Sequence, residues 1–375
     1  MKKINFIKKV TPLSADTFNT MQNNIEEEFS QINAQLAEIA IDPINYGAAG
    51  DGVTDDTSVI QNLLKSNVNL ILNGRTYAIQ PLTFTGLKNF KISNGKFKNL
   101  AGISSVELTN EPATLNFKAC SNFKLENIEI DSSGGEWTRR PYVDEANFND
   151  YLTKRKKTYG GLRLDDCSNF TIDKVLCHHS RTGFYSAHCT DGLFIQCEAR
   201  YTQADGYFNT GSARNITLFK CKSIHVNDDC FTFLGYHDNS YPKDCFIDSC
   251  YAYDGHALCC LEGAVNCEIV NSNGYLLRYI PFKLGGYNTG RGKNTRVINC
   301  TAKLDTRLNN LLSNYSPYLV NSKPNNSEVS NNNSYYMENV LIDFSAVENL
   351  GQIVLAKNCT DFIIKNCNII APNNK

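Results

Sequence analysis

The stretch NFTIDKV, at residues 169–175, returns along this chain as a seven-residue repeat. Each copy begins with Asn or Asp, has an apolar residue at its centre and, in most cases, ends in a small or thiol side chain. The other copies are DGLFIQC from Asp191, NITLFKC from Asn215, DCFIDSC from Asp244, NCEIVNS from Asn266, NTRVINC from Asn294, NVLIDFS from Asn339 and DFIIKNC from Asp361, with weaker copies from Asn89 and Asn122. From Asn169 onward the starts are 22 to 29 residues apart, except for one interval of 45 that we expect to hold two turns or a long excursion. Such spacing indicates one supersecondary unit per repeat.

The repeat predicts short β-strands, because its copies are rich in β-branched and aromatic residues and are bounded by Gly, Asn, Asp and Ser. Between one copy and the next lies a second short strand: GLRL from Gly161, GFYS from Gly183, GYFN from Gly206, CFTF from Cys230, ALCC from Ala257 and PFKL from Pro281. Periods this short do not suit propeller blades. We therefore predict an all-β fold, a right-handed single-stranded parallel β-helix (solenoid) whose strands stack about 4.8 Å apart.

Nine of the fifteen cysteines share two positions relative to the repeat. One set shares the seventh position, namely Cys197, Cys221, Cys250, Cys300 and Cys367, and another lies two residues before the start, namely Cys120, Cys167, Cys189 and Cys359. These positions predict two internal ladders of thiols that pack as small apolar side chains. Disulfides and a thiol-bound metal are not expected, because the number is odd and the spacings of zinc sites are missing.

Composition narrows the class of protein. Hydrophobic residues make up 42% of the chain and charged residues 20%, which excludes a disordered protein. With 37 Lys+Arg against 38 Asp+Glu the net charge is -1, so nucleic acid is not an expected partner. No run of about 18 apolar residues occurs, and we expect neither a membrane span nor a signal peptide. Folding in a cytoplasm is the expectation, with no cofactor.

The first part of the chain carries a helical pattern. Residues 12–40 are predicted to form a helix, in which a seven-residue spacing joins Phe18, Ile25, Ile32 and Ile39. We expect residues 1–42 to form an N-terminal α-helical attachment and oligomerisation segment, and residues 43–375 to form the β-helix domain. A helix that docks on its own domain is the alternative.

The motif GAAGDGVTDDTSVIQ, from Gly47 to Gln61, follows this segment. Physically it predicts a capped helix over the open end of the solenoid, with Thr54, Asp55 and Asp56 accepting hydrogen bonds from its free amide groups. The motif resembles the opening of the pectate-lyase-like β-helix superfamily, which is common in phage tail spikes and appendages. The resemblance implies the same fold and leaves the substrate open.

Two stretches interrupt the repeat and are predicted to be loop insertions, near residues 131–160 and 305–336. The first contains Trp137, with Tyr142 and Tyr151 nearby, whose flat faces suit sugar rings. These aromatic residues can equally anchor the loop to its own scaffold. The basic run at residues 154–157 can meet an acidic glycan or be solvated charge.

A group of acids precedes the second strand in consecutive turns. Asp205 lies eight residues after Cys197, and Asp229 lies eight after Cys221, so both should occupy the same place on adjacent turns. Asp228 is beside them, and His256 and Lys283 follow in the next two turns. Clustered carboxylates repel, so one should retain its proton, which is what acid and base hydrolysis of a glycosidic bond needs. Turn chemistry alone is the competing explanation for each acid.

These segments also resemble the motifs of polygalacturonase-type glycoside hydrolases, NTDG, NxDDC, GHG and RIK, in that order. Here they read QADG ending at Gly206, VNDDC ending at Cys230, DGHA ending at Ala257 and RYIPFK from Arg278 to Lys283. The resemblance implies that Asp228 is the general acid, that Asp205 and Asp229 position the nucleophilic water, and that His256 tunes the acid. Lys283, with Arg278, is implied to bind substrate, to which the first insertion adds Trp137.

Other chemistries have weaker patterns. A calcium-dependent lyase would need acids facing a base, and Asp165 and Asp166 with Arg163 are the candidates. His178, His179 and His188 suggest a metal, but the sequence supplies no further ligands at suitable spacing, so no metal is expected.

We therefore expect a phage tail-spike-like protein, located in the virion tail, that binds and hydrolyses a bacterial surface polysaccharide. It is expected to be a homotrimer that attaches to a phage tail or baseplate protein through its N-terminus. A non-catalytic receptor-binding or structural fibre is the alternative, and a bacterial polygalacturonase-like hydrolase is the second alternative.

Overall fold

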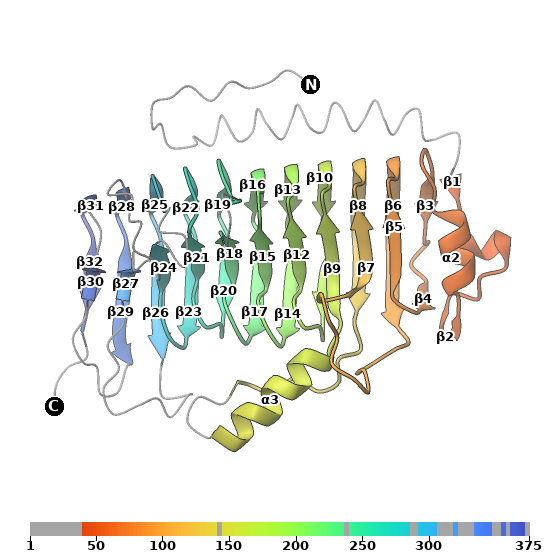
Figure 1. Ribbon diagram of the computed structural model, residues 1–375, viewed down its shortest axis with the longest axis horizontal. Helices are drawn as coiled ribbons and strands as arrows, with labels where there is room; N and C mark the ends of the chain where they lie inside the picture. The colour runs from red at the N-terminus through yellow and green to blue at the C-terminus, as the bar shows by residue number, and fades with distance from the viewer. Residues whose placement is uncertain are drawn as a thin grey trace.

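The computed structural model describes residues 40–140, 145–235, 240–285, 292–305, 318–321, 334–346, 354–357 and 361–371 of the 375-residue chain. These residues form a right-handed parallel β-helix whose turns stack along the longest axis of the molecule (Figure 1). The predicted fold class is confirmed. The helix predicted over residues 12–40 lies outside the described residues, except that Ala40 is in a strand.

Each turn contributes strands to three faces. The repeat forms the first face, with β1 (Ala40–Ile41), β3 (Asn69–Ile71), β10 (Ser168–Asp173), β13 (Thr190–Ile195), β16 (Arg214–Phe219), β19 (Phe246–Asp248), β22 (Glu268–Val270), β25 (Thr295–Ile298), β28 (Ser334–Glu338) and β31 (Asp361–Lys365). The long strands β6 (Lys88–Asn99) and β8 (Ser121–Asp131) run through the first and second faces.

The second face follows the repeat directly and was not anticipated from the sequence. It contains β2 (Asp51–Asp55), β4 (Thr76–Ile79), β11 (Leu176–His178), β14 (Glu198–Thr202), β17 (Lys222–Val226), β20 (Tyr251–Tyr253), β23 (Asn273–Leu277), β26 (Thr301–Asp305), β29 (Leu341–Ala346) and β32 (Asn368–Ile370). Its strands are as short as three residues and their buried positions hold small side chains such as Cys177, Ala199 and Ser223, so they have no distinctive apolar alternation.

The third face is the predicted second strand of each turn. It is a ten-stranded parallel sheet of β5 (Leu82–Thr85), β7 (Ala113–Lys118), β9 (Gly160–Asp165), β12 (Phe184–Ala187), β15 (Tyr207–Thr210), β18 (Phe231–Leu234), β21 (Cys259–Glu262), β24 (Phe282–Gly285), β27 (Tyr318–Asn321) and β30 (Val354–Lys357). The candidate acids lie at its leading edge.

The first residue of each repeat has a backbone reason to be Asn or Asp. Asn169, Asp191 and Asn215 all adopt left-handed φ angles of 51° to 53°, which Asn and Asp tolerate better than other L residues. The side chains also bond between turns, as when the Asn215 amide donates to the Asp191 carboxylate at 2.9 Å. This position is therefore the corner at which the chain enters the first face.

One copy of the repeat was assigned wrongly. The phrase from Asn339 begins at the sixth position of its turn, because the Asn339 amide bonds to Asn299, the sixth residue of the preceding copy. The strand in register with β25 is β28, with Tyr335 opposite Thr295. The long interval therefore holds one turn with an excursion, and β29 belongs to the second face.

The interior is packed with stacked like side chains. Phe90, Phe123 and Phe170 stack at centroid distances of 4.8 and 5.5 Å. All fourteen cysteines that the structure describes are free, and thirteen of them are buried. The thiol of Cys197 donates to the Ile172 carbonyl at 3.1 Å, and the thiols of Cys221, Cys250 and Cys300 likewise bond to carbonyls of the turn before them. Cys359 lies outside the described residues.

Within the part of the chain that the structure describes, two α-helices and one 3-10 helix pack against the solenoid. η2 (Pro43–Tyr46) and α2 (Thr57–Leu63) lie at its N-terminal end, where Ile60 enters the core (Figure 1). The predicted capping is only partly right: Asp55 accepts from the Thr57 amide at 2.9 Å, whereas Asp56 binds the amides of Ala49 and Gly50. Asp56 thus stabilises the glycine-rich turn instead of the helix.

The first insertion contains a helix, α3 (Glu145–Lys157), where a loop was predicted. It lies along one side of the solenoid (Figure 1). Tyr151 is buried and its hydroxyl donates a hydrogen bond to the Gln203 carbonyl. This bond attaches α3 to the segment that directly precedes Asp205. None of the described helices is long and apolar enough to cross a membrane.

Candidate active site

The register of the third face brings the predicted acids together. Tyr207 of β15 is opposite Phe231 of β18, so Asp205 and Asp229, each two residues earlier, lie one above the other. The Gly206 amide donates to the Asp229 carbonyl at 3.0 Å, and the His256 amide donates to the Asp228 carbonyl at 3.0 Å. These backbone bonds hold the acids and the histidine on one wall over consecutive turns.

Asp229 is paired with a lysine and a histidine. The Lys283 ammonium lies 2.7 Å from Oδ1 and 2.9 Å from Oδ2 of Asp229. His256 places Nδ1 3.2 Å from Asp229 Oδ1 and 3.8 Å from Asp228 Oδ1. The His256 ring stacks on Tyr279 at 4.6 Å, which sets its orientation. Asp229, His256 and Lys283 therefore form one polar unit.

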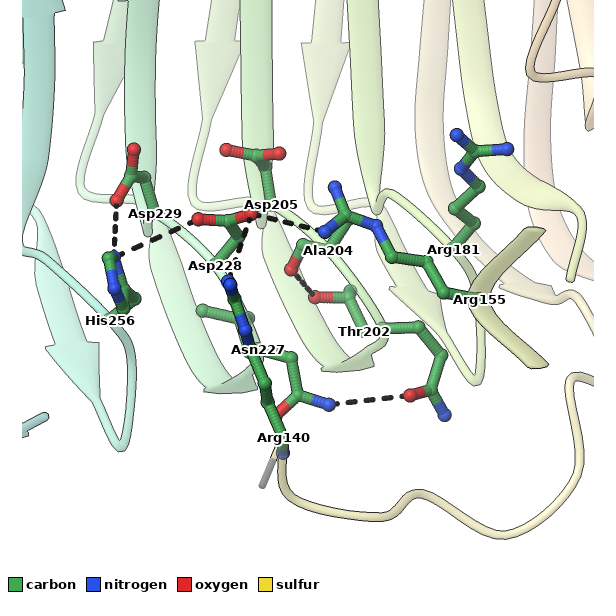
Figure 2. A network of polar contacts seen from close by, with 12 residues as sticks. Arg140, Arg155, Arg181, Thr202, Ala204, Asp205, Asn227, Asp228, Asp229 and His256 are labelled. Atoms are coloured by element: carbon green, nitrogen blue, oxygen red, sulfur yellow. Dashed lines mark hydrogen bonds and ion pairs between the residues drawn. The ribbon is translucent and has the colours of Figure 1, made fainter. Parts of the chain in front are cut away.

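Two arginines of the first insertion contact Asp228. Arg155 of α3 donates to its Oδ2 at 3.2 Å, and Arg140 lies 3.7 Å from the same oxygen (Figure 2). The Asp228 side chain remains 21% exposed, the largest exposure among the three acids. The insertion therefore lies over the acids and neutralises the most accessible one.

The environments of the acids separate their proton affinities. Burial raises the pKa of Asp205 well above its usual value, and the negative charges of Asp228 and Asp229 raise it further. The Thr232 hydroxyl donates a hydrogen bond to Asp205 Oδ1 at 3.2 Å. Burial acts in the same direction on Asp228 and Asp229, but Lys283 and the other nearby cations outweigh it and lower both pKa values. The cluster thus combines one carboxyl that retains its proton to higher pH with two that ionise more readily than a free aspartate.

Two further groups complete the electrostatics. Burial, followed by the charge of Lys283, lowers the pKa of His256 to about 4, so its imidazole is neutral near pH 7. Burial raises the pKa of Glu262 to about 7, against the opposing charge of Lys283. Lys283 itself has a raised pKa, because the charges of Asp229 and Asp228 outweigh its desolvation. The ammonium is the counter-ion of the whole cluster.

The donor atoms of Asp228, Asp229 and His256 are close enough to share a metal ion. The Lys283 ammonium, however, already lies within 3 Å of both Asp229 oxygens. A divalent cation at this point would face that ammonium and the Arg155 guanidinium across a few ångströms, so the donor set does not favour one.

The predicted substrate-binding residues have different surroundings. Trp137 packs against Tyr201 and His225, with centroids 6.1 and 5.4 Å apart, and donates Nε1–H to the Thr202 carbonyl at 3.1 Å. It therefore anchors the insertion. Arg278 is fully buried and bonds to Asn227 and to backbone carbonyls beneath the acids. Tyr142 lies outside the described residues.

The candidates for other chemistries are accounted for by local structure. Arg163 forms a two-pronged pair with Asp165, at 2.7 and 3.1 Å, and lies over the Tyr185 ring. Asp166 adopts a left-handed φ of 54° at a corner. His188 contacts Ser212 of the next turn. These contacts stabilise the solenoid and do not assemble the acids and base of a lyase.

Several residues of the site were not predicted from the sequence. Arg155 stood out only as part of a basic run, and Arg140 was not a candidate. Asn227 binds the insertion twice, since its Oδ1 accepts from the Arg140 amide at 2.8 Å and its Nδ2 donates to the Thr138 carbonyl at 2.7 Å. The position of Asn227 directly before the two acids was the one feature of the sequence that could have indicated its role.

Comparison with known proteins supports the fold. No protein-family model and no curated protein sequence matches the chain. Solved structures do match: ORF18 of Geobacillus virus E2 has a TM-score of 0.60 at 13% identity, over 92% of this chain and 64% of that one. A polygalacturonase from Erwinia carotovora ssp. carotovora has a TM-score of 0.56 at 14% identity, over 84% and 94%.

A third similar structure is PfbA, a surface adhesin of Streptococcus pneumoniae, with a TM-score of 0.51 at 12% identity, over 88% of this chain and 78% of that one. At these identities the likeness establishes the fold alone. The chain is a right-handed parallel β-helix protein. It shares this architecture with polygalacturonases and with phage tailspikes.

Proposed function

We propose that the protein hydrolyses a bacterial surface polysaccharide, with inversion at the anomeric carbon, at Asp205, Asp228 and Asp229. The observation that carries the proposal is the convergence of these acids with His256 and Lys283 on one outer wall. Inverting hydrolysis requires one carboxyl that donates a proton to the leaving oxygen and another carboxylate that activates water. The raised pKa of Asp205 and the lowered pKa values of Asp228 and Asp229 give the cluster carboxyl groups of different proton affinity.

The proposed division of labour follows from the accessibility of each group. Asp228 is the most exposed acid and is the one that can reach a leaving group, as its resemblance to the acid of polygalacturonases implies. Lys283, followed by His256, Arg155 and Arg140, lowers its pKa, so withdrawal of the insertion's two arginines would raise its affinity for a proton. An entering glycan would displace them, and Asp229, oriented by Lys283, would then help to position the water.

The test is the release of reducing ends from host-envelope polysaccharides. Wild type should release them, and Asp228→Asn should lower kcat by about 100-fold or more, the usual loss for a general acid or base. Asp166→Asn is the matched control, because this exposed acid lies at a corner and Asn tolerates its left-handed backbone. Equal activity of Asp228→Asn and wild type would refute the role of the acid.

A non-catalytic glycan-binding protein is the second candidate. The favouring observation is that the first insertion covers the acids, with Arg155 and Arg140 on Asp228. The similar adhesin structure supports the same alternative. Glycan retention by both wild type and Asp228→Asn, without any reducing ends from either, would favour binding over hydrolysis.

The proposed setting is a phage tail, with residues 1–42 forming the attachment segment of a homotrimer. The seven-residue pattern over residues 12–40 and the similar viral structure support it. Light scattering should give a trimer mass for wild type and a smaller mass for the double variant Ile25→Asp/Ile32→Asp. A wild-type monomer would favour the bacterial hydrolase setting.

A further inference from the structure

A second polar cluster lies at the root of the first insertion. Asp131 is the last residue of β8, and His178, the last residue of β11, is directly opposite it in the parallel pair. His179 follows immediately. Nδ1 of His178 lies 2.6 Å from Nδ1 of His179, and Asp131 Oδ1 lies 3.7 and 3.9 Å from these two nitrogens. Three metal-ligating groups therefore face one point.

The backbone explains why two consecutive histidines point to the same side. Successive side chains of a strand normally alternate between faces. His179 leaves the strand with a left-handed φ of 49°, which turns its ring toward His178. Its ring also stacks on Tyr201, at 5.3 Å and an interplanar angle of 20°, so its position is supported by the next turn.

At His178 the hydrogen bond to Glu129 selects the tautomer that a metal needs, and metal binding would release the proton that the Nδ1 atoms of His178 and His179 share. Nε2 of His178 lies 3.3 Å from Glu129 Oε1, and Lys96 holds the other oxygen of Glu129 at 2.9 Å. An ionised carboxylate only accepts, so the proton of a neutral His178 sits on Nε2 and its Nδ1 presents a lone pair. A carboxylate behind a histidine is the usual outer support of a metal-binding imidazole.

The third donor is held in the same way. Asp131 Oδ1 accepts from the Ser133 amide at 2.8 Å, which fixes the carboxylate toward the histidines. The side chains are 31%, 14% and 36% exposed for Asp131, His178 and His179, so solvent can supply another ligand. The site is thus half-open and prearranged.

We propose that Asp131, His178 and His179 bind a Zn²⁺ ion. Bonds of about 2.0–2.1 Å in a tetrahedron place ligand atoms roughly 3.3 Å apart. The observed separations of 2.6 to 3.9 Å straddle that value, so small rotations of the rings complete the site. Two imidazoles and one carboxylate suit zinc better than magnesium or calcium, which prefer oxygen ligands.

The ion would clamp the start of the insertion to the solenoid. The insertion leaves directly after Asp131, where the Ser132 amide donates to the His178 carbonyl at 3.1 Å and the Gly134 amide to the His179 carbonyl at 2.8 Å. The same insertion carries Arg140 and Arg155 to Asp228. Zinc would therefore stiffen the segment that covers the acids, without taking part in their chemistry.

The test is direct metal binding by the full chain after removal of metals with a chelator. Titration with Zn²⁺ against a chromophoric chelator should give one equivalent that the double variant His178→Gln/His179→Gln loses. His188→Gln, which changes an exposed histidine outside the cluster, should keep it. Glu129→Gln should weaken binding by about 10 to 100-fold, as for other outer carboxylates of metal sites.

Substitution with Co²⁺ distinguishes this site from the cysteines. Visible absorption without the intense near-ultraviolet band of a thiolate complex is expected, and it should vanish in the double variant. Circular dichroism checks that each variant is folded. Absence of a zinc equivalent in wild type, or an equivalent that persists in the double variant, would overturn the proposal. Neither result depends on whether the protein hydrolyses a glycan.

Discussion

The interior thiol ladder and the outer acid cluster are both stacks of like residues, yet they are held by opposite means. Cys197, Cys221 and Cys250 occupy equivalent positions on consecutive turns, are at most 1% exposed, and donate their thiols to backbone carbonyls of the preceding turn. The acids Asp205 and Asp229 also stack, but the cluster depends on Lys283, His256 and the insertion's Arg155 for compensating charge.

This difference shows which side chains a repeat can stack without compensating groups from other parts of the chain. Repetition of a small apolar side chain adds favourable packing at every turn. Repetition of a carboxylate adds repulsion and desolvation, so it persists only where other parts of the chain supply charge. A buried stack of acids in a solenoid therefore points to a use other than stability.

The largest loss of stability is expected when an acid is placed in the thiol ladder. Cys221→Asp would bury a carboxyl among thiols and aromatic rings without a compensating cation in the ladder, and should destabilise the fold by more than about 4 kcal/mol. Cys221→Ala, the control, removes one sulfur atom and should cost about 1 kcal/mol. Urea denaturation measures both. Similar stability of the two variants would contradict the distinction.

Removing the counter-ion of the acid cluster should have the next largest effect. Lys283→Met leaves Asp229 and Asp228 without the ammonium and should cost about 3 kcal/mol of unfolding free energy, as for other broken buried pairs. The double variant Lys283→Met/Asp229→Asn should be more stable than the single one, because it removes the orphaned charge. Additive losses in the double variant would argue against this coupling.

The smallest effect tests the proton on Asp205. In the unfolded chain Asp205 ionises near its ordinary pKa of 3.8, whereas in the folded protein its pKa is raised. Its contribution to stability is therefore full below pH 3.8 and is lost as the pH rises toward the folded pKa. Asp205→Asn should gain stability relative to wild type as the pH rises above 3.8, until the folded pKa of Asp205 is passed. A difference independent of pH would show that Asp205 is ionised in the fold.

Local residue patterns account for most of what could be predicted about the fold. The spacing of Asn169, Asp191 and Asn215 gave the turn length, because the corner needs a left-handed residue at each turn. The same rule misled at Asn339, since the sixth position of the repeat also has a left-handed φ and also favours Asn. The second face and α3 were missed because neither has a distinctive apolar period.

Only those contacts of the site that follow from the register between adjacent turns could be predicted from the sequence. Equal spacing from the ladder cysteines placed Asp205 beside Asp229. Nothing in the local sequence links Arg155 to Asp228, or Asp131 to His178, because these contacts depend on the path of an insertion and on a strand pair between turns. Arg278 has the residue type of a ligand-binding group, and only its surroundings show that it is buried.

The amino-acid sequence by itself determined the solenoid, its thiol ladders and the wall on which the acids gather, since each follows from which side chains recur at a fixed spacing. Only the tertiary structure set the relative proton affinities of those acids, the covering of Asp228 by the insertion and the proximity of Asp131 to two histidines. The physical reason is that electrostatic energies depend on distances between groups far apart in the chain, which a one-dimensional pattern does not contain.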